Sequence, residues 1–363
     1  MSDQPGLILL LGSGETAPSA QKIYHWLFSR IREQTGDGIR VAVLETPAGF
    51  EPNSADVAGQ VDAYIQKRLQ NFRPSVQIVP ARKQGTAHSP DDPALAAMLH
   101  DANVIFLGPG SPTYAARQLR GSLVWETLRA CHRAGAVIML ASAATLAFSR
   151  HTVPVYEIYK VGEDVHWKPG LDFFGDFGLS TVFVSHWNNR DGGATLDTSR
   201  CYLGQQRFGQ MVQMLPGGLA ENTVVGIDEN TALVVDPASR AWQVMGPGHV
   251  TIQGQHGTAL YPTGVIRPMS DFGMFALPTP IERGITPAVW QEMLAGRVAG
   301  EAVRAAQPHP SEAVLALVAA RQAARTARDW AESDRLRDEL AAQGWQVLDT
   351  TEGQVVNPLT ISN

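Results

Sequence analysis

The stretch Gly135-Ala-Val-Ile-Met-Leu-Ala-Ser142-Ala-Ala-Thr-Leu-Ala-Phe148 decides how this chain folds. Its apolar run at 136–140 predicts a buried parallel strand, and the spacing of apolar residues after 144 is helical. A serine at such a strand-to-helix corner projects its hydroxyl from the sheet edge, with a free helix N-terminus behind it, as in a nucleophile elbow. A serine that only caps a buried helix is the alternative, and this stretch does not choose between them.

Strands and helices alternate on the N-terminal side of this stretch. Helical spacing is found at Ile23, Leu27 and Ile31 and again over 57–69, where we expect Ser54 to be the N-cap. Buried strands are predicted at 7–11, 40–44, 76–79 and 104–107. Because no hairpin separates these elements, we predict an α/β fold: a doubly wound, mainly parallel sheet covered on both faces.

The pattern changes after Phe148. Residues 153–178 are rich in glycine, aromatic and charged residues and predict a long, partly irregular excursion, whereas short runs over 232–265 predict an antiparallel edge. Three parts are expected: a domain at 1–277, a helix and linker at 278–310, and a helical module at 311–363. The linker is Gln307-Pro-His-Pro310, and Ser311 is the expected N-cap of the module.

Composition excludes several classes of function. The 363 residues carry a formal net charge of -6, which gives the whole protein no field that attracts nucleic acid or an anionic membrane. Cys131 and Cys201 lie in no motif and suit a reducing compartment. The N-terminus has no basic region, and no apolar run approaches membrane-spanning length, so we expect a cytoplasmic protein without a membrane partner. Whether it forms a homodimer is left open.

A serine nucleophile needs a base held by a carboxylate. His186 follows the predicted strand 181–184, and Asp228 and Glu229 follow another strand. Because the C-terminal ends of parallel strands gather at one edge of a sheet, we expect these side chains near Ser142. A histidine buried in the core or at an interface is the alternative for His186.

These residues resemble the cyanophycinase and dipeptidase E group of serine peptidases, which have the class I glutamine amidotransferase-like fold. The resemblance covers about residues 6–265. It rests on the Ser142 corner, on His186 and on three further motifs: Gly12-Ser-Gly-Glu15, Phe106-Leu-Gly-Pro-Gly110 and Gly226-Ile-Asp-Glu-Asn-Thr-Ala232. It implies that Ser142 is the nucleophile, His186 the base and Glu229 the acid. The N–H groups of Gly110 and Ala143 would then form the oxyanion hole.

The chain departs from the family pattern at the corner, where Leu140 and Ala144 replace glycines, and at Pro109. Cyanophycinases carry several arginines after the histidine, but here only Arg190 keeps such a position, which argues against cyanophycin. Because a guanidinium pairs bidentately with carboxylate, Arg190 points to a small acidic peptide or isopeptide as substrate. The expected substrate contacts are Glu15, Ser111, Asn189, Arg190 and Arg200.

A nucleotide or metal site is not expected. Gly12-x-Gly14-x-x-Ala17 formally matches a dinucleotide fingerprint, but Pro18 and Ser19 delay the helix that would point at a pyrophosphate. Histidines, cysteines and carboxylates show no zinc spacing. We therefore expect neither a cofactor nor a metal.

The segment at 320–353 resembles the C-terminal helical region of cysteinyl-tRNA synthetases, where it helps to dock tRNA. Acidic residues offset the five arginines of this segment, so it offers little non-specific attraction to phosphate. A helical hairpin that packs or binds a protein partner is the alternative to tRNA binding through 311–363. The rival to an enzyme is accordingly a catalytically silent scaffold that presents this module.

Overall fold

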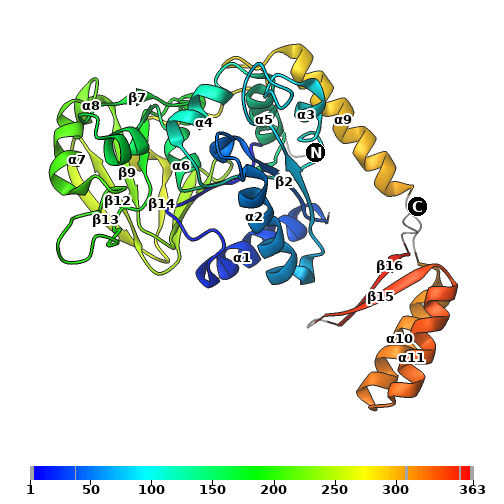
Figure 1. Cartoon of the computed structure of the whole chain (residues 1–363). Coiled ribbons are helices and arrows are strands. Elements are labelled where there is room, and N and C mark those ends of the chain that lie inside the picture. The colour runs from blue at the N-terminus through cyan, green and yellow to red at the C-terminus, as the bar shows by residue number, and fades with distance from the viewer. Residues whose placement is uncertain (1–3, 37, 307–309, 351–352, 360–363) are drawn as a thin grey trace. The chain divides into compact units, whose positions relative to one another are not determined.

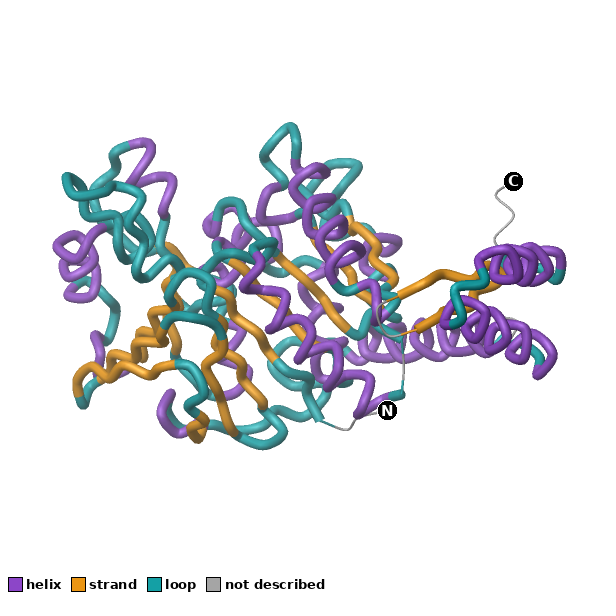
Figure 2. Tube along the Cα trace, turned by 90° about the horizontal axis from the view of Figure 1, so that it is seen from below, coloured by secondary structure: helices purple, strands orange, loops and turns teal. Residues whose placement is uncertain are grey.

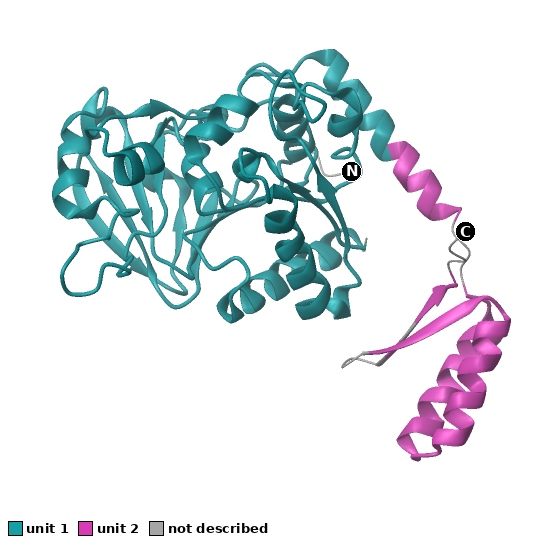
Figure 3. Cartoon of the chain, viewed as in Figure 1, with its two compact units in different colours: residues 1–297 teal, residues 298–363 magenta. Residues whose placement is uncertain are grey.

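The computed structural model describes residues 4–36, 38–306, 310–350 and 353–359 (Figure 1). The chain divides into two compact units, 1–297 and 298–363, and the division falls inside helix α9 (Figure 3). The mostly parallel α/β fold expected from the sequence is confirmed in the larger unit. Within the described residues, no helix combines the length and the apolar character needed to cross a membrane.

An eight-stranded sheet runs through the larger unit in the order β14-β11-β10-β1-β5-β4-β2-β3. The five strands from β1 to β3 in this order pair in parallel, while β10, β11 and β14 add antiparallel strands beside β1. The strands are β1 (Ile8–Leu11), β2 (Arg40–Leu44), β3 (Ser75–Val79), β4 (Val104–Leu107), β5 (Val137–Ala141), β10 (Ala232–Asp236), β11 (Ala241–Met245) and β14 (Ile266–Pro268).

Both faces of this sheet are buried, because successive side chains of a strand point to opposite faces. In β1, Ile8 and Leu10 join one apolar cluster, whereas Leu9 and Leu11 join the other. The second cluster is completed by α1 (Pro18–Thr35) and α2 (Ser54–Arg68). The first is covered by α3 (Pro93–Ala97), α4 (Pro112–Leu119), α5 (Leu123–Arg133), α6 (Ala143–Ala147) and α9 (Pro287–Ala305). Figure 2 shows helices on both sides of the strands.

A second sheet, in the order β13-β12-β9-β8, was not predicted. Its strands are β8 (Thr181–Val184), β9 (Thr223–Ile227), β12 (His249–Gly254) and β13 (Gly257–Pro262), and α7 (Gly204–Gln213) and α8 (Gly218–Glu221) connect β8 to β9. The predicted antiparallel edge at 232–265 is thus divided between two sheets. The excursion after Phe148 contains the short pair β6 (His151–Thr152) and β7 (Lys168–Pro169) and a π-helical segment, Glu157–Val161.

Ser54 does not cap α2, contrary to the sequence prediction. Asn53 occupies the N-cap position, and Ser54 is the first residue of the helix. The Ser54 hydroxyl donates instead to Glu45 Oε2 at 2.9 Å, and Arg82 Nε forms an ion pair with the same oxygen at 2.6 Å. Ser54 therefore satisfies a buried carboxylate, which the local sequence pattern could not reveal.

Helix α9 is anchored in the larger unit by its first half. Val289 and Met293 are buried in the apolar cluster, and Arg297 Nη1 donates to the carbonyl of Ala134 at 2.6 Å. Part of the expected 278–310 connection is therefore core structure. Residues 307–309 of the expected linker lie outside the described residues.

The C-terminal module has a small core of its own. It consists of α10 (Glu312–Thr326), α11 (Trp330–Ala342) and the antiparallel pair β15 (Trp345–Thr350) and β16 (Gly353–Pro358). As expected, Ser311 is the N-cap of α10, and its Oγ accepts from the N–H of Val314. Leu340 and Trp345 belong to the apolar cluster, and the buried Arg321 forms a bidentate ion pair with Asp349 at 2.7 and 3.1 Å.

Candidate active site

Ser142 stands at the corner between β5 and α6, in a strained backbone conformation with φ 51° and ψ -111°. Such a conformation costs about 1–3 kcal/mol and persists only where the surroundings fix it. The N–H of Ser142 donates to the carbonyl of Leu11 at 3.2 Å, and the N–H of Ala144 donates to the carbonyl of Gly108. Leu140 is fully buried in the core, so the leucine that departs from the family pattern is a packing residue.

His186 follows β8 and lies between Ser142 and a carboxylate. Its Nε2 is 2.8 Å from Ser142 Oγ, and its Nδ1 is 2.7 Å from Glu229 Oε1. An ionised carboxylate can only accept, so we assign the proton of the neutral ring to Nδ1. Nε2 is then free to accept from the serine hydroxyl. The sequence placed these three side chains near one another, and the structure brings them into one hydrogen-bonded series.

Glu229 is held in place by three hydrogen bonds, the first of which is the one from His186. Asn189 Nδ2 donates to Glu229 Oε1 at 2.8 Å, and the backbone N–H of Glu229 donates to Asn188 Oδ1. The hydrogen bond from His186, and next that from Asn189, holds the pKa of Glu229 below its ordinary value, although partial burial opposes this. The neighbouring Asp228 accepts instead from the N–H of His249, so Glu229 is the residue that orients the imidazole.

Two backbone N–H groups beside Ser142 have no acceptor among the described residues: those of Gly110 and Ala143. Both residues line the same cavity as Ser142. Gly110 has φ 142°, and a Cβ there would lie 2.0 Å from the carbonyl oxygen of Pro47. Only glycine therefore fits at position 110, because the chain packs directly against the backbone of Pro47 there.

Gly12 ties the segments of the site together. Its N–H donates to the carbonyl of Thr231 at 3.0 Å, and its own carbonyl accepts from the N–H of His186 at 3.1 Å. A Cβ on Gly12 would lie 2.1 Å from the carbonyl oxygen of Asp228, and one on Gly14 would lie 2.3 Å from Asn230 Oδ1. Contact with backbone atoms requires glycine at position 12, and a φ of 77° favours glycine at position 14, so both glycines of the formal dinucleotide fingerprint have a structural reason within the protein.

A cavity of about 440 Å³ opens beside Ser142. Sequence reasoning missed a set of polar and aromatic residues that line it. They are Tyr156, Tyr159, Lys160, Asp191 and Tyr202. The signal that was available is the cluster of tyrosines and a lysine at 156–160, inside the excursion that we expected to be irregular.

None of the five expected substrate contacts lines this cavity. Ser111 is the N-cap of α4, Asn189 is buried against Glu229, and Arg190 is exposed. Arg200 stacks on the ring of Trp187 at 3.9 Å and donates to its carbonyl. Glu15 is half-buried, does not cap α1, and has a carbonyl that accepts from Tyr24. The guanidinium groups of Arg190 and Arg200 are therefore not the cations of the cavity.

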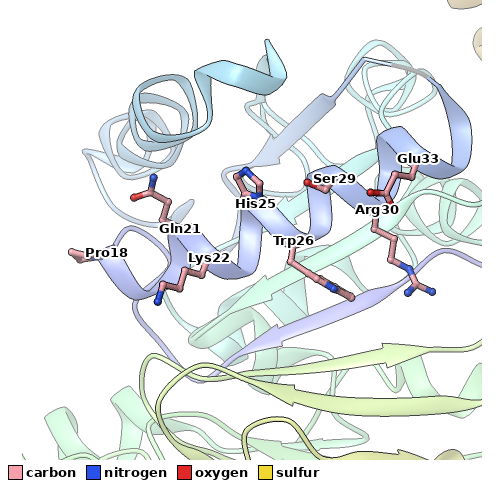
Figure 4. A pocket seen from close by; sticks show the side chains of 8 residues that line it. All are labelled: Pro18, Gln21, Lys22, His25, Trp26, Ser29, Arg30 and Glu33. Carbon is pink, nitrogen blue, oxygen red and sulfur yellow. The ribbon is translucent and has the colours of Figure 1, made fainter. Parts of the chain in front are cut away.

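A second hollow in the larger unit lacks a comparable pair of side chains. This hollow of about 740 Å³ lies along a single face of α1 and is lined by Pro18, Gln21, Lys22, His25, Trp26, Ser29, Arg30 and Glu33 (Figure 4). It has no serine hydrogen-bonded to a histidine. In the described part of the chain, no three histidine, cysteine or carboxylate side chains are grouped as a metal site would require.

The two parts of the chain are similar to different proteins. Residues 307–356 match the family described as the cysteinyl-tRNA ligase anticodon binding domain. Cysteine–tRNA ligase 1 of Burkholderia lata is 54% identical over 43 residues, which are 12% of this chain and 9% of that protein. The cysteine–tRNA ligase of Afipia carboxidovorans is 60% identical over 40 residues, which are 11% of this chain and 9% of that protein. This chain thus spans about a tenth of the length of these relatives.

The larger unit is similar in fold to a solved peptidase from an acI-B1 Actinobacterium. The similarity covers 73% of this chain and 98% of that one, with a TM-score of 0.58 and 20% sequence identity. At this identity the likeness establishes the fold. The resemblance to peptidases that the sequence motifs imply is therefore confirmed at the level of the fold, and the resemblance of the C-terminal module to cysteinyl-tRNA synthetases is confirmed by the family match.

If Gly12 is packed directly against the backbone of Asp228, then Gly12→Ala will destabilise the protein by about 1–3 kcal/mol, because backbone atoms must shift to admit the methyl group. Gly209 is the matched control: it lies in α7, and a Cβ there meets nothing within 4 Å. Gly209→Ala should stabilise by about 0.5–1 kcal/mol, as expected for glycine in a helix. Denaturant unfolding measures both. Equal effects of the two substitutions would contradict the role given to Gly12.

Proposed function

We propose that the larger unit is a serine hydrolase of the cyanophycinase and dipeptidase E type, which cleaves an amide bond in a small acidic peptide or isopeptide. The observation that carries this proposal is the hydrogen-bonded series from Ser142 through His186 to Glu229 beside a cavity of about 440 Å³. A core serine and a core histidine have no need of an adjoining cavity, so this arrangement favours chemistry over packing.

In the proposed reaction, Ser142 Oγ attacks the carbonyl carbon of the scissile bond while His186 Nε2 takes the hydroxyl proton. His186 then gives that proton to the leaving amine, and an acyl-enzyme remains. Glu229 holds the imidazole in its tautomer and stabilises its charged form. The N–H groups of Gly110 and Ala143 donate to the developing oxyanion, and each lowers the activation barrier by about 3 kcal/mol. Water, activated by His186, hydrolyses the ester.

A cysteine nucleophile is not supported. Cys131 and Cys201 are both buried, and burial raises the pKa of each thiol to about 12. Because the thiolate is the reactive form of cysteine, these residues are inert at neutral pH. The serine therefore remains the candidate nucleophile, even though Cys201 lines the same cavity.

The proposal predicts that a fluorophosphonate probe labels Ser142. Intact mass should show one adduct on the wild type and none on Ser142→Ala, because the probe needs an activated serine. His186→Ala should slow labelling by at least about 10²-fold, the usual contribution of a general base. His249→Ala is the matched control, because His249 also adjoins a carboxylate, at 3.4 Å from Asp228, but does not contact Ser142. Undiminished labelling of His186→Ala would refute the base.

A second function, tRNA binding by the C-terminal module, is favoured by the match at 307–356. Trp330 is 57% exposed, and Arg325 lies 5.6 Å from the centre of its ring, an arrangement on which an unpaired base could stack. Phosphate attraction is limited because several arginines of the module are already paired, among them Arg325 with Asp349, and Arg335 with Glu332 and Glu339. Stacking rather than charge would then supply most of the affinity.

We therefore expect the full chain to bind tRNA with micromolar affinity and a shallow salt dependence. A plot of the logarithm of the binding constant against the logarithm of the salt concentration should have a slope of magnitude about two or less. A chain that ends at Ala306 keeps Val289 and Met293 in the core and should lose binding without unfolding. Trp330→Ala should weaken binding by about 1–3 kcal/mol if a base stacks there. Titrations at several salt concentrations measure all three. Unchanged binding by the shortened chain would contradict the assignment to the module.

A further inference from the structure

We propose that Lys160 is the residue that binds the carboxylate of the substrate, in the role that the sequence suggested for Arg190. This inference rests on the proposed function and adds the specificity-determining group to it. Lys160 lines the same cavity as Ser142 and His186, whereas Arg190 is exposed and does not line it.

The segment that carries Lys160 is fixed at several points. Ile158 is buried in the apolar cluster beneath the second sheet, and Glu157 Oε1 accepts from Thr113 Oγ1 at 2.6 Å. Gly162 ends the π-helical segment with φ 87°. Lys160 therefore projects from an ordered turn that lines the cavity. Such pre-organisation lowers the entropic cost of binding.

The ammonium group of Lys160 has no carboxylate within ion-pair distance among the described residues. The acids nearest in sequence are engaged elsewhere: Glu157 with Thr113, and Glu163 with His166 at 3.6 Å. The nearest aromatic ring is that of Tyr159, whose centre lies 5.1 Å from Lys160 Nζ. A cation without an anionic partner, in the cavity of a protein with net charge -6, favours an anionic ligand group.

The opposite charge in the cavity lies on Asp191. Tyr202 donates its hydroxyl to Asp191 Oδ2 at 2.9 Å, and hydrogen bonds from Asn189 and Tyr202 lower the pKa of this carboxyl. An ionised Asp191 repels a second carboxylate. The ring of Tyr202 lies 5.2 Å from that of Tyr159 and 5.7 Å from that of His186, which places two tyrosines between Lys160 and the base. The substrate carboxylate is thus directed to the Lys160 side.

Two sources could supply this carboxylate: an acidic side chain next to the scissile bond, or the free C-terminus of a short peptide. Both present the same planar anion to the ammonium group. We use three peptides of equal length to distinguish them: one with aspartate and an amidated C-terminus, one with asparagine and an amidated C-terminus, and one with asparagine and a free C-terminus. A neutral p-nitrophenyl ester reports the basal reaction.

The test compares the kcat/KM values of wild type, Lys160→Met, Lys160→Arg and the control Arg190→Met. Lys160→Met should lower kcat/KM for one carboxylate-bearing peptide by about tenfold, mainly through KM, as for loss of a charged hydrogen bond. In the same variant, kcat/KM for the amidated asparagine peptide and for the ester should change less than about twofold. Lys160→Arg should retain most of the preference for the carboxylate-bearing peptide, and Arg190→Met should have the kcat/KM values of wild type. The peptide for which kcat/KM falls identifies the source of the carboxylate.

Equal losses on all four substrates would assign Lys160 a structural role and overturn the proposal, as would a selective loss in Arg190→Met. Melting temperatures verify that each variant is folded, which the exposure of Lys160 favours. Fluorophosphonate labelling of the same samples separates the two levels of inference. Normal labelling without carboxylate preference in the wild type refutes only the role of Lys160, whereas absent labelling of the wild type refutes the serine hydrolase and this inference with it.

Discussion

The backbone hydrogen bonds at the end of β1 are the constraint on which the site depends. Leu11 pairs with Ala141 in the parallel register of β1 and β5, and its carbonyl accepts from the N–H of Ser142. The next residue, Gly12, accepts from the N–H of His186 and donates to the carbonyl of Thr231. Two consecutive peptide groups therefore hold the serine corner, the histidine and the turn that carries Glu229. Ser142 and His186 both have positive φ, and this network fixes both strained corners.

The site belongs to two sheets at once. Ser142 follows β5 of the large sheet, whereas His186 and Glu229 follow β8 and β9, which pair in parallel in the second sheet. Parallel pairing brings the C-terminal ends of β8 and β9 together, so the histidine and the carboxylate meet there. The excursion between β5 and β8 then supplies the cavity wall with Tyr159 and Lys160. The hydrogen-bonded series and this part of the cavity wall are thus carried by different segments, so that substitutions in the wall can leave the series intact.

Sequence reasoning succeeded where a short periodic pattern determines structure. The buried runs before Ser142 predicted the parallel sheet, and strand ends placed His186 and Glu229 near the serine. It failed where the outcome depends on contacts between distant segments. The stacking of Arg200 on Trp187, the bond from Ser54 to Glu45 and the second sheet all arise from tertiary packing, which no local period encodes. Lys160 escaped notice because the 153–178 excursion has no regular spacing, although its cluster of tyrosines was visible.

The most direct test of the central claim, that Ser142 and His186 act as one unit, is the kinetic coupling between them. The measurement is kcat/KM for the p-nitrophenyl ester with Ser142→Ala, His186→Ala and the double variant, each compared with wild type. If the histidine acts only through the serine, each single substitution costs about as much as the pair, and the three variants agree within a few-fold. If the two losses multiply instead, Ser142 and His186 contribute independently, and the hydrogen bond between them is not the basis of the activity.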